Sequence, residues 1–112
     1  WERRKAEGPK DPMVHGASGL HAACLPWLHR KDIAMLGSDM ASDVLPSGYE
    51  EFRLPVHIGV LPVMGCWMLD NCNLEDLSDR CREEERYEFM VVVNPLRLSK
   101  GTGAPVNPIA IF

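Results

Sequence analysis

The chain lacks the features that mark several large functional classes. Its 112 residues contain no CxxC pair, no unbroken apolar run of about 20 residues that could span a bilayer, and no excess of basic residues, because the formal net charge is −4. A nucleic-acid surface needs clustered Lys and Arg, and the basic cluster at 3–5 is too short to supply one. We therefore expect no nucleic-acid partner and no membrane insertion.

Signatures of covalent catalysis and of phosphate binding are also missing. No GxSxG serine elbow occurs in the sequence. The glycines of Gly101-Thr102-Gly103 lack the lysine and the following helix that a phosphate-binding loop needs. These absences favour metal-assisted hydrolysis over a covalent mechanism.

The four cysteines allow two interpretations. An even number could form an extracellular disulfide framework, but such frameworks are typical of shorter and less apolar chains than this one, which is 46% hydrophobic. We adopt the other interpretation, reduced thiols in a cytoplasmic protein. No signal peptide opens the chain, and it begins with Trp1 rather than methionine, so we expect a processed or truncated start.

Alternating helix and strand signals predict an α/β fold. We expect an extended lead-in over 1–17 and one domain over 18–112. The expected helices cover 18–28 (kinked or restarted at Pro26), 55–64 and 73–86, and the expected strands cover 32–36, 66–69 and 87–93. The tail from Ala104, with two prolines, is expected to form an edge strand or a strap rather than an internal strand. An irregular loop at 40–54 separates the two halves of the pattern, and loops of this length are usually functional or disordered.

Two expectations concern packing. The strand at 87–93 is apolar on both alternating sets, as in a central strand covered on both faces, and Trp27 and Trp67 are assigned to the core. A sheet of three or four strands would leave open edges, which need a partner.

His57 and Asp70 are the main candidates for chemistry. If a helix begins at Pro55, His57 lies in its first turn, where the helix dipole disfavours the imidazolium. A neutral imidazole could ligate a metal or accept a proton. Asp70 follows an apolar strand, and open α/β sheets bind ligands at the carboxyl ends of strands. The alternatives are a histidine satisfied by local hydrogen bonds and an aspartate that forms a turn.

Two further residues are weaker candidates for substrate binding. His21 could line a pocket, although its spacing of eight residues from His29, about 12 Å on a helix, is too long for the pair to share one ion. Asp39 follows the strand at 32–36 and could contact substrate, or it could cap a turn.

Three blocks carry a resemblance to a known family. They are GLHAACLPWLHRKDIAMLGSD, LPVHIGVLPVMGCWMLDNCNLEDL and GTGAPVNPIAIF, and together they span about 16–112. In this order they resemble the C-terminal half of the cyclase-type metal-dependent hydrolases, the family of bacterial kynurenine formamidase (an arylformamidase) and isatin hydrolase. The N-terminal metal motif of that family, HxGTHxDxPxH, does not occur in this chain.

The resemblance implies a fold, a reaction and a set of partners. It implies the C-terminal half of a cyclase-like α/β domain with a mixed sheet, incomplete without an N-terminal half or a partner chain that carries the main metal motif. The complete enzyme would use Zn(II) or Mn(II) to activate a water that cleaves an amide, formamide or lactam bond. His57 would be a metal ligand or general base and Asp70 a metal ligand or its support, a place where many relatives carry Glu or Gln.

This chain alone is then expected to be inactive, since two ligands fall short of the four usual for zinc. We expect a homo-oligomer, because a half-sheet leaves edges unpaired. One alternative is a non-catalytic binding or assembly subunit that kept the half-fold without the metal. Another is a stand-alone α/β protein whose likeness to the family is architectural only.

Overall fold

A computed structural model describes residues 2–112 as a small α/β fold in two compact units, one ending at Leu74 and the other beginning at Glu75. The first unit contains α1 (Glu2–Glu7), α2 (Pro12–His15), η1 (Ala22–Cys24), α3 (Leu25–Arg30), β1 (Met35–Gly37), α4 (Pro55–Ile58), η2 (Gly59–Val63) and β2 (Trp67–Leu69). The second contains α5 (Glu75–Glu83), β3 (Met90–Val92) and β4 (Ile109–Ile111). A single domain over 18–112 stays a prediction.

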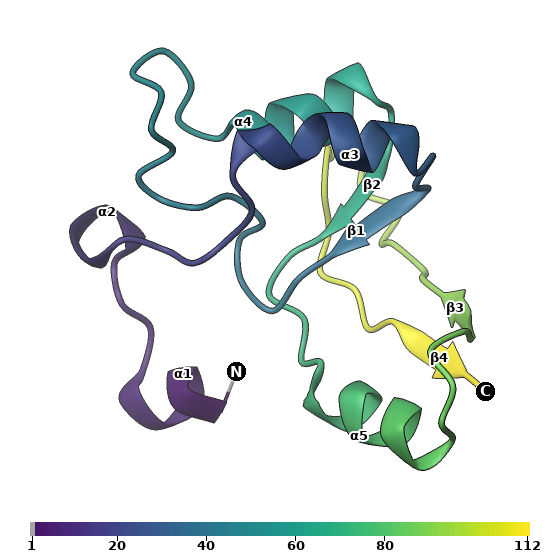
Figure 1. The fold of residues 1–112 in the computed structure, drawn as a ribbon. Coiled ribbons are helices and arrows are strands. Elements are labelled where there is room, and N and C mark those ends of the chain that lie inside the picture. Colours follow the sequence, from purple (N-terminus) through teal and green to yellow (C-terminus); the bar gives the residue numbers. More distant parts are fainter. Residues whose placement is uncertain (1) are drawn as a thin grey trace. The chain divides into compact units, whose positions relative to one another are not determined.

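The first unit is built around a parallel pair of strands, β1 and β2, with Leu36 opposite Met68. Its helices α3 and α4 lie on one face of this pair (Figure 1). The core consists of Leu28 from α3 together with Val56 and Val60, and both valines are fully buried. A two-stranded parallel sheet is normally part of a larger one, because parallel strands need both faces covered.

The helix that carries the candidate histidine begins and ends as predicted. Pro55 occupies its first turn, where the missing N–H costs nothing, and the chain leaves the helix at Gly65 with a φ of 69°. Pro62 cannot donate an internal hydrogen bond, and the chain accommodates it by continuing α4 as one π-helical turn, η2.

Other predicted elements differ in detail. Short helices α1 and α2 lie in the segment predicted as an extended lead-in. The helix predicted from Ser18 begins only at Ala22, where the His21 ring accepts the capping hydrogen bond, and it restarts as α3 with Pro26 in the first turn. The residues of 40–54 form no helix and no regular strand.

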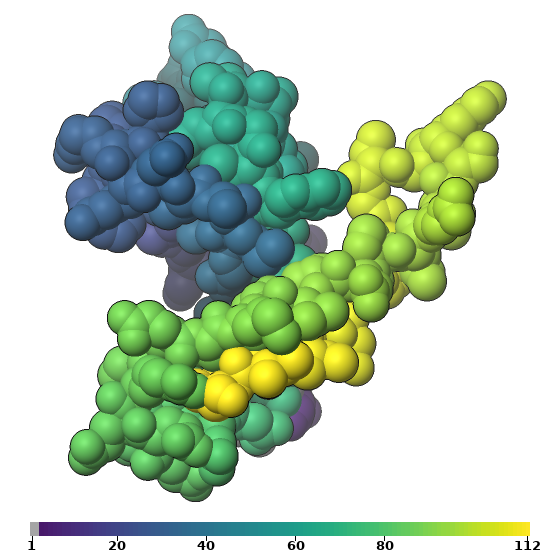
Figure 2. Space-filling model, turned by 90° about the vertical axis from the view of Figure 1, so that its right-hand side faces the viewer, coloured from purple at the N-terminus to yellow at the C-terminus, as the bar shows by residue number. Residues whose placement is uncertain are grey.

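The second unit pairs β3 and β4 in antiparallel register, with Val91 opposite Ala110. In Figure 2 the yellow C-terminal segment lies alongside the green segment of this unit. The tail thus forms an edge strand, as predicted. The prediction of a covered central strand at 87–93 is wrong, because β3 has only one partner among the described residues and Met90 is 58% exposed. Apolar character on both faces shows that a strand can be buried, not that the chain itself supplies the cover.

The assignment of Trp27 and Trp67 to the core is also wrong, since their exposures are 53% and 68%. The two described sheets have two strands each and leave both outer edges open, one sheet parallel and one antiparallel rather than a single mixed sheet. No helix within residues 2–112 combines the length and the apolar character needed to cross a membrane.

Candidate functional site

The candidate site lies at the carboxyl ends of the two parallel strands. The chain after β1 runs beside the chain after β2, and the backbone hydrogen bonds Ser38 N to Leu69 O (2.9 Å), Asn71 N to Met40 O (3.1 Å) and Cys72 N to Ser38 O (2.9 Å) hold the two segments together. Asp70 therefore emerges next to the segment 38–43. This is the edge of an open α/β sheet at which ligands usually bind.

Asp43, at the end of that segment, is fully buried beneath the first turn of α4. Its Oδ1 accepts the Val56 N–H at 2.6 Å, and its Oδ2 accepts the His57 N–H at 3.0 Å. The residue at the helix cap position is Leu54, which has no side-chain acceptor to offer. Asp43 thus supplies from a distant loop the acceptor that a capping side chain normally provides.

The His57 ring is held at both nitrogens. Nδ1 lies 2.5 Å from Asp43 Oδ2, and Nε2 lies 2.9 Å from Asp70 Oδ2. A neutral imidazole has one N–H and can satisfy only one of these carboxylates, whereas an imidazolium satisfies both.

The environment of His57 changes its protonation in the direction opposite to that expected from the sequence. Burial lowers the pKa of the imidazole, but the hydrogen bonds and charges of Asp43 and Asp70 outweigh it, and the pKa is raised above its ordinary value of 6.5. The two carboxylates thus act against the helix dipole, which was expected to disfavour the imidazolium.

Asp70 is oriented by Ser42. The Ser42 hydroxyl donates to Asp70 Oδ1 at 2.8 Å, and the Ser42 backbone N–H donates to the same oxygen at 3.1 Å. Asp70 Oδ2 is the oxygen that faces His57. The Asp70 side chain is 27% exposed and that of His57 22%, so the pair is reached by solvent while Asp43 lies beneath it.

The structure thus brings together the two residues predicted to carry chemistry, His57 and Asp70, and gives the two weaker candidates other contacts. His21 caps η1 by accepting the Ala23 N–H at 3.2 Å, and its ring lies 5.7 Å from that of Tyr49 in the long loop. Asp39 is exposed in the turn after β1. These observations do not test a role in substrate binding, which stays a prediction for both His21 and Asp39.

Sequence reasoning missed Ser42 and did not assign Asp43 a role. One signal could have pointed to Asp43. A helix that opens with Leu54-Pro55 has no capping side chain of its own, so its first N–H groups need an acceptor from elsewhere, and a carboxylate in the preceding loop is a natural source. No comparable signal marks Ser42, because loop serines are common.

The cysteines do not extend the site. All four are free thiols, and Cys72, which follows the Asp70 turn, has a raised pKa because burial disfavours the thiolate. A raised pKa reduces the fraction of thiolate, which is the nucleophilic form.

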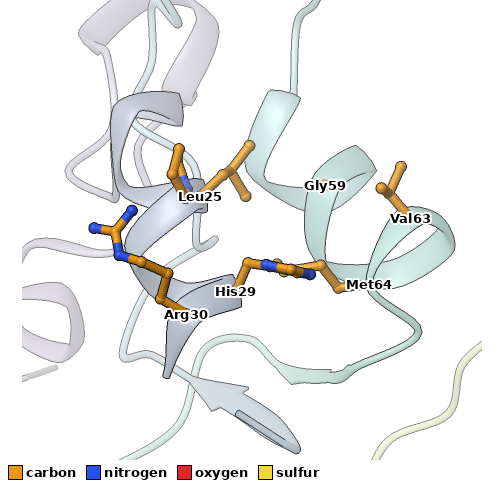
Figure 3. A pocket seen from close by; sticks show the side chains of 7 residues that line it. Leu25, His29, Arg30, Gly59, Val63 and Met64 are labelled. Carbon is orange, nitrogen blue, oxygen red and sulfur yellow. The ribbon is translucent and has the colours of Figure 1, made fainter. Parts of the chain in front are cut away.

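A second concave feature of the same unit is an open groove of about 370 Å³ between α3 and the α4–η2 helix. Figure 3 shows His29 projecting from α3 toward Met64, at the end of the α4–η2 helix. Asp43, His57 and Asp70 do not line this groove. The acid–imidazole array is thus a separate feature of the first unit.

Within residues 2–112, no group of three or more His, Cys, Asp and Glu side chains is arranged to hold a metal ion by itself. Comparisons with models of known protein families, with curated proteins and with solved structures found no match to this chain.

Proposed function

We propose that this chain is the C-terminal part of a metal-dependent hydrolase that cleaves an amide, formamide or lactam C–N bond in a small molecule. The observation that carries the proposal is the Asp43–His57–Asp70 array. In metalloenzymes a ligating histidine commonly donates its other ring N–H to a carboxylate, which fixes the tautomer and raises the basicity of the ligating nitrogen. Asp43 occupies that position against Nδ1.

The residues present fit a divalent ion, Zn(II) or Mn(II), as two of its ligands. Nε2 of His57 and Oδ2 of Asp70 face each other, are partly exposed, and are nitrogen and oxygen donors that both metals accept. When bound, the ion supplies a water of lowered pKa and polarises the substrate carbonyl. With the ion bound, Asp43 would hold the proton on Nδ1, which would leave the lone pair of the imidazole on Nε2.

The remaining ligands belong, in this proposal, to an N-terminal half or a separate chain. Two donors fall short of a four-coordinate site, so the 112-residue chain alone is proposed to be inactive. The open edges of β1–β2 and of β3–β4 are places where a companion half or a second copy of the chain could add strands. The free thiols suit the reducing cytoplasm, which we propose as its compartment.

The experiment that tests this function is a His57→Ala substitution in the complete protein, with His29→Ala as the matched control. His29 is an exposed histidine of α3 that lies outside the array. We expect His57→Ala to lose most turnover of formamide and lactam substrates and to lower bound Zn or Mn, with the fold retained by circular dichroism. Near-normal substrate turnover by the His57→Ala variant would contradict the role proposed for His57.

The same array also suits a second function, a non-catalytic binding or assembly subunit. One imidazole between two carboxylates ties α4 to the chain segments that follow β1 and β2, which is a structural role that needs no metal. In that case the loop at 40–54 would be an interface rather than a wall of the active site. Metal analysis of the complex with its full partner distinguishes the two, because the subunit would retain no transition metal.

A further inference from the structure

Ser42 is almost completely buried, at 1% exposure, and both of its donors are directed at one carboxylate oxygen. The hydroxyl and the backbone N–H of Ser42 reach Asp70 Oδ1 at 2.8 and 3.1 Å. Two hydrogen bonds to the same oxygen fix the rotation of the carboxylate. The other oxygen, Oδ2, is thereby left toward His57 Nε2.

The surroundings of Ser42 fix its own position. The Ser38 hydroxyl, which donates to Met40 O at 2.6 Å, lies 3.1 Å from the Ser42 hydroxyl. The Ser42 carbonyl accepts the Leu20 N–H at 2.8 Å, so the residue is tied to the chain on two sides. A buried hydroxyl held in this way is pre-organised, and little conformational entropy is lost when it orients its partner.

The next residue in the chain, Asp43, does the equivalent for His57. Its carboxylate holds both the backbone N–H and the ring Nδ1 of that histidine. Ser42 therefore holds Asp70, and the adjacent Asp43 holds His57, so that consecutive residues bind the two members of the donor pair. Because their spacing along the backbone is fixed, the gap between Nε2 and Oδ2 depends on this dipeptide.

We propose that Ser42 is a positioning residue that, together with Asp43, sets the separation and orientation of the His57 and Asp70 donors. The inference deepens the proposed function, since the donor pair is the part of the metal site that this chain contributes. It predicts that removing one hydroxyl, with no contact to His57, changes both the state of the His57 ring and the affinity for a metal ion.

The test uses Ser42→Ala, with Ser47→Ala as the matched control. Ser47 is a second buried serine at 6% exposure, and its hydroxyl donates to Phe52 O at 2.6 Å without contacting the array. Two readouts on the full chain are needed: the Nε2 resonance of His57 in long-range proton–nitrogen spectra, and the affinity for Zn(II) alone measured by competition with a chelating dye.

We expect Ser42→Ala to shift the Nε2 resonance and to weaken Zn(II) binding roughly 10- to 100-fold, the usual effect of removing a group that orients a ligand. Ser47→Ala should change neither. Ser42→Cys, which is close in size but a weak donor, should resemble Ser42→Ala and serves if the alanine variant does not fold. Ser42→Thr, which keeps the hydroxyl, should largely restore the wild-type Nε2 resonance and the wild-type Zn(II) affinity.

Unchanged Nε2 resonances in Ser42→Ala and Ser42→Cys would overturn the inference, whatever the metal data show. If the wild-type chain binds no Zn(II), even together with a companion half, the proposed function fails separately. The resonance then still decides whether Ser42 positions the pair.

Discussion

At the scale of single residues, one carboxylate performs two tasks. Asp43 accepts the first N–H groups of α4 and also holds the ring of His57, and it does both while fully buried. A buried charge is tolerated only when it is paired and hydrogen-bonded, and here three donors surround it. Replacing it should therefore affect folding as well as the histidine.

We expect Asp43→Asn to lower the free energy of unfolding by about 1–3 kcal/mol, because the new NH₂ group would face N–H donors and leave at least one of them unsatisfied. Urea denaturation measures the change. Asp32→Asn is the control, an exposed residue at φ 51° where asparagine is well tolerated, and it should stay within about 0.5 kcal/mol. Equal effects of the two substitutions would contradict the buried role of Asp43.

The raised pKa of His57 predicts how stability changes with pH. A folded-state pKa above the unfolded value means that the folded chain binds the proton more tightly. This stabilisation is complete below the unfolded pKa of about 6.5 and is lost as the pH rises through the higher folded value. Urea midpoints of the metal-free chain should fall over that window.

The check is the difference between the chain and its His57→Gln variant across about pH 5 to 8. The variant should lack this decline, whereas His29→Gln should retain it. A His57→Gln curve that runs parallel to the wild-type curve would show that the two carboxylates do not stabilise the imidazolium.

The identities of the two candidate residues were more predictable than their surroundings. His57 and Asp70 could be singled out because one opens a helix and the other ends a strand, both local features of the sequence. Their direct contact is held in place by Ser42 and Asp43. It depends on how the loop that carries these two residues folds against α4, and no local sequence pattern encodes that. The direction of the His57 pKa depended on the same unseen neighbours.

At the scale of elements, the loop that carries Asp43 is fixed by a close backbone crossing. Residues 17–20 pair with 42–45 through Ala17–Leu45 and Leu20–Asp43 bridges, and Gly19 lies directly against the Asp43 backbone. A Cβ on Gly19 would be 2.3 Å from the Asp43 carbonyl carbon, far inside van der Waals contact. Glycine is therefore required here by the approach of two chains, not by its φ.

We expect Gly19→Ala to destabilise the chain by roughly 1–3 kcal/mol, as overpacking does, and to shift the His57 ring resonances because Asp43 must move. Gly37→Ala is the control, since nothing lies within 4 Å of the position its Cβ would take. Thermal unfolding and the His57 spectra report the two effects. A Gly19→Ala chain with wild-type spectra would mean that this crossing does not determine where Asp43 lies.

Elements with strong local signals were predictable, and those that depend on cover were not. The helix from Pro55, the strand at 67–69 and the edge strand at the tail follow from proline, glycine and apolar patterns. The exposure of Trp27, Trp67 and β3 could not be predicted in the same way. Apolar residues indicate a surface that tends to be buried, but the residues that bury it need not belong to the same chain.

At the scale of the whole molecule, the described residues leave sheet edges unpaired and two tryptophans, Trp27 and Trp67, exposed. Two-stranded sheets are marginal in water, and a partner that adds strands would cover both apolar faces and open edges. Binding of a companion half should therefore be detectable by fluorescence, without an activity assay.

We expect acrylamide quenching of Trp67 fluorescence to fall when the chain is in its native complex, because its side chain, 68% exposed here, would become covered. A Trp67→Phe variant identifies the signal. Native mass spectrometry of the same sample should show a partner chain or a longer parent chain. Unchanged quenching and a lone 12.6 kDa species would argue against the companion half.

The double use of Asp43 has a consequence for how such chains diverge. If the proposed function holds, a lineage that lost the chemistry could exchange His57 or Asp70, which are partly exposed, while α4 would still need an acceptor beneath its first turn. The aspartate would then be kept for the helix after the reaction was lost. In a set of relatives, its presence would indicate only the helix, and the His57–Asp70 pair would distinguish active members from inactive ones.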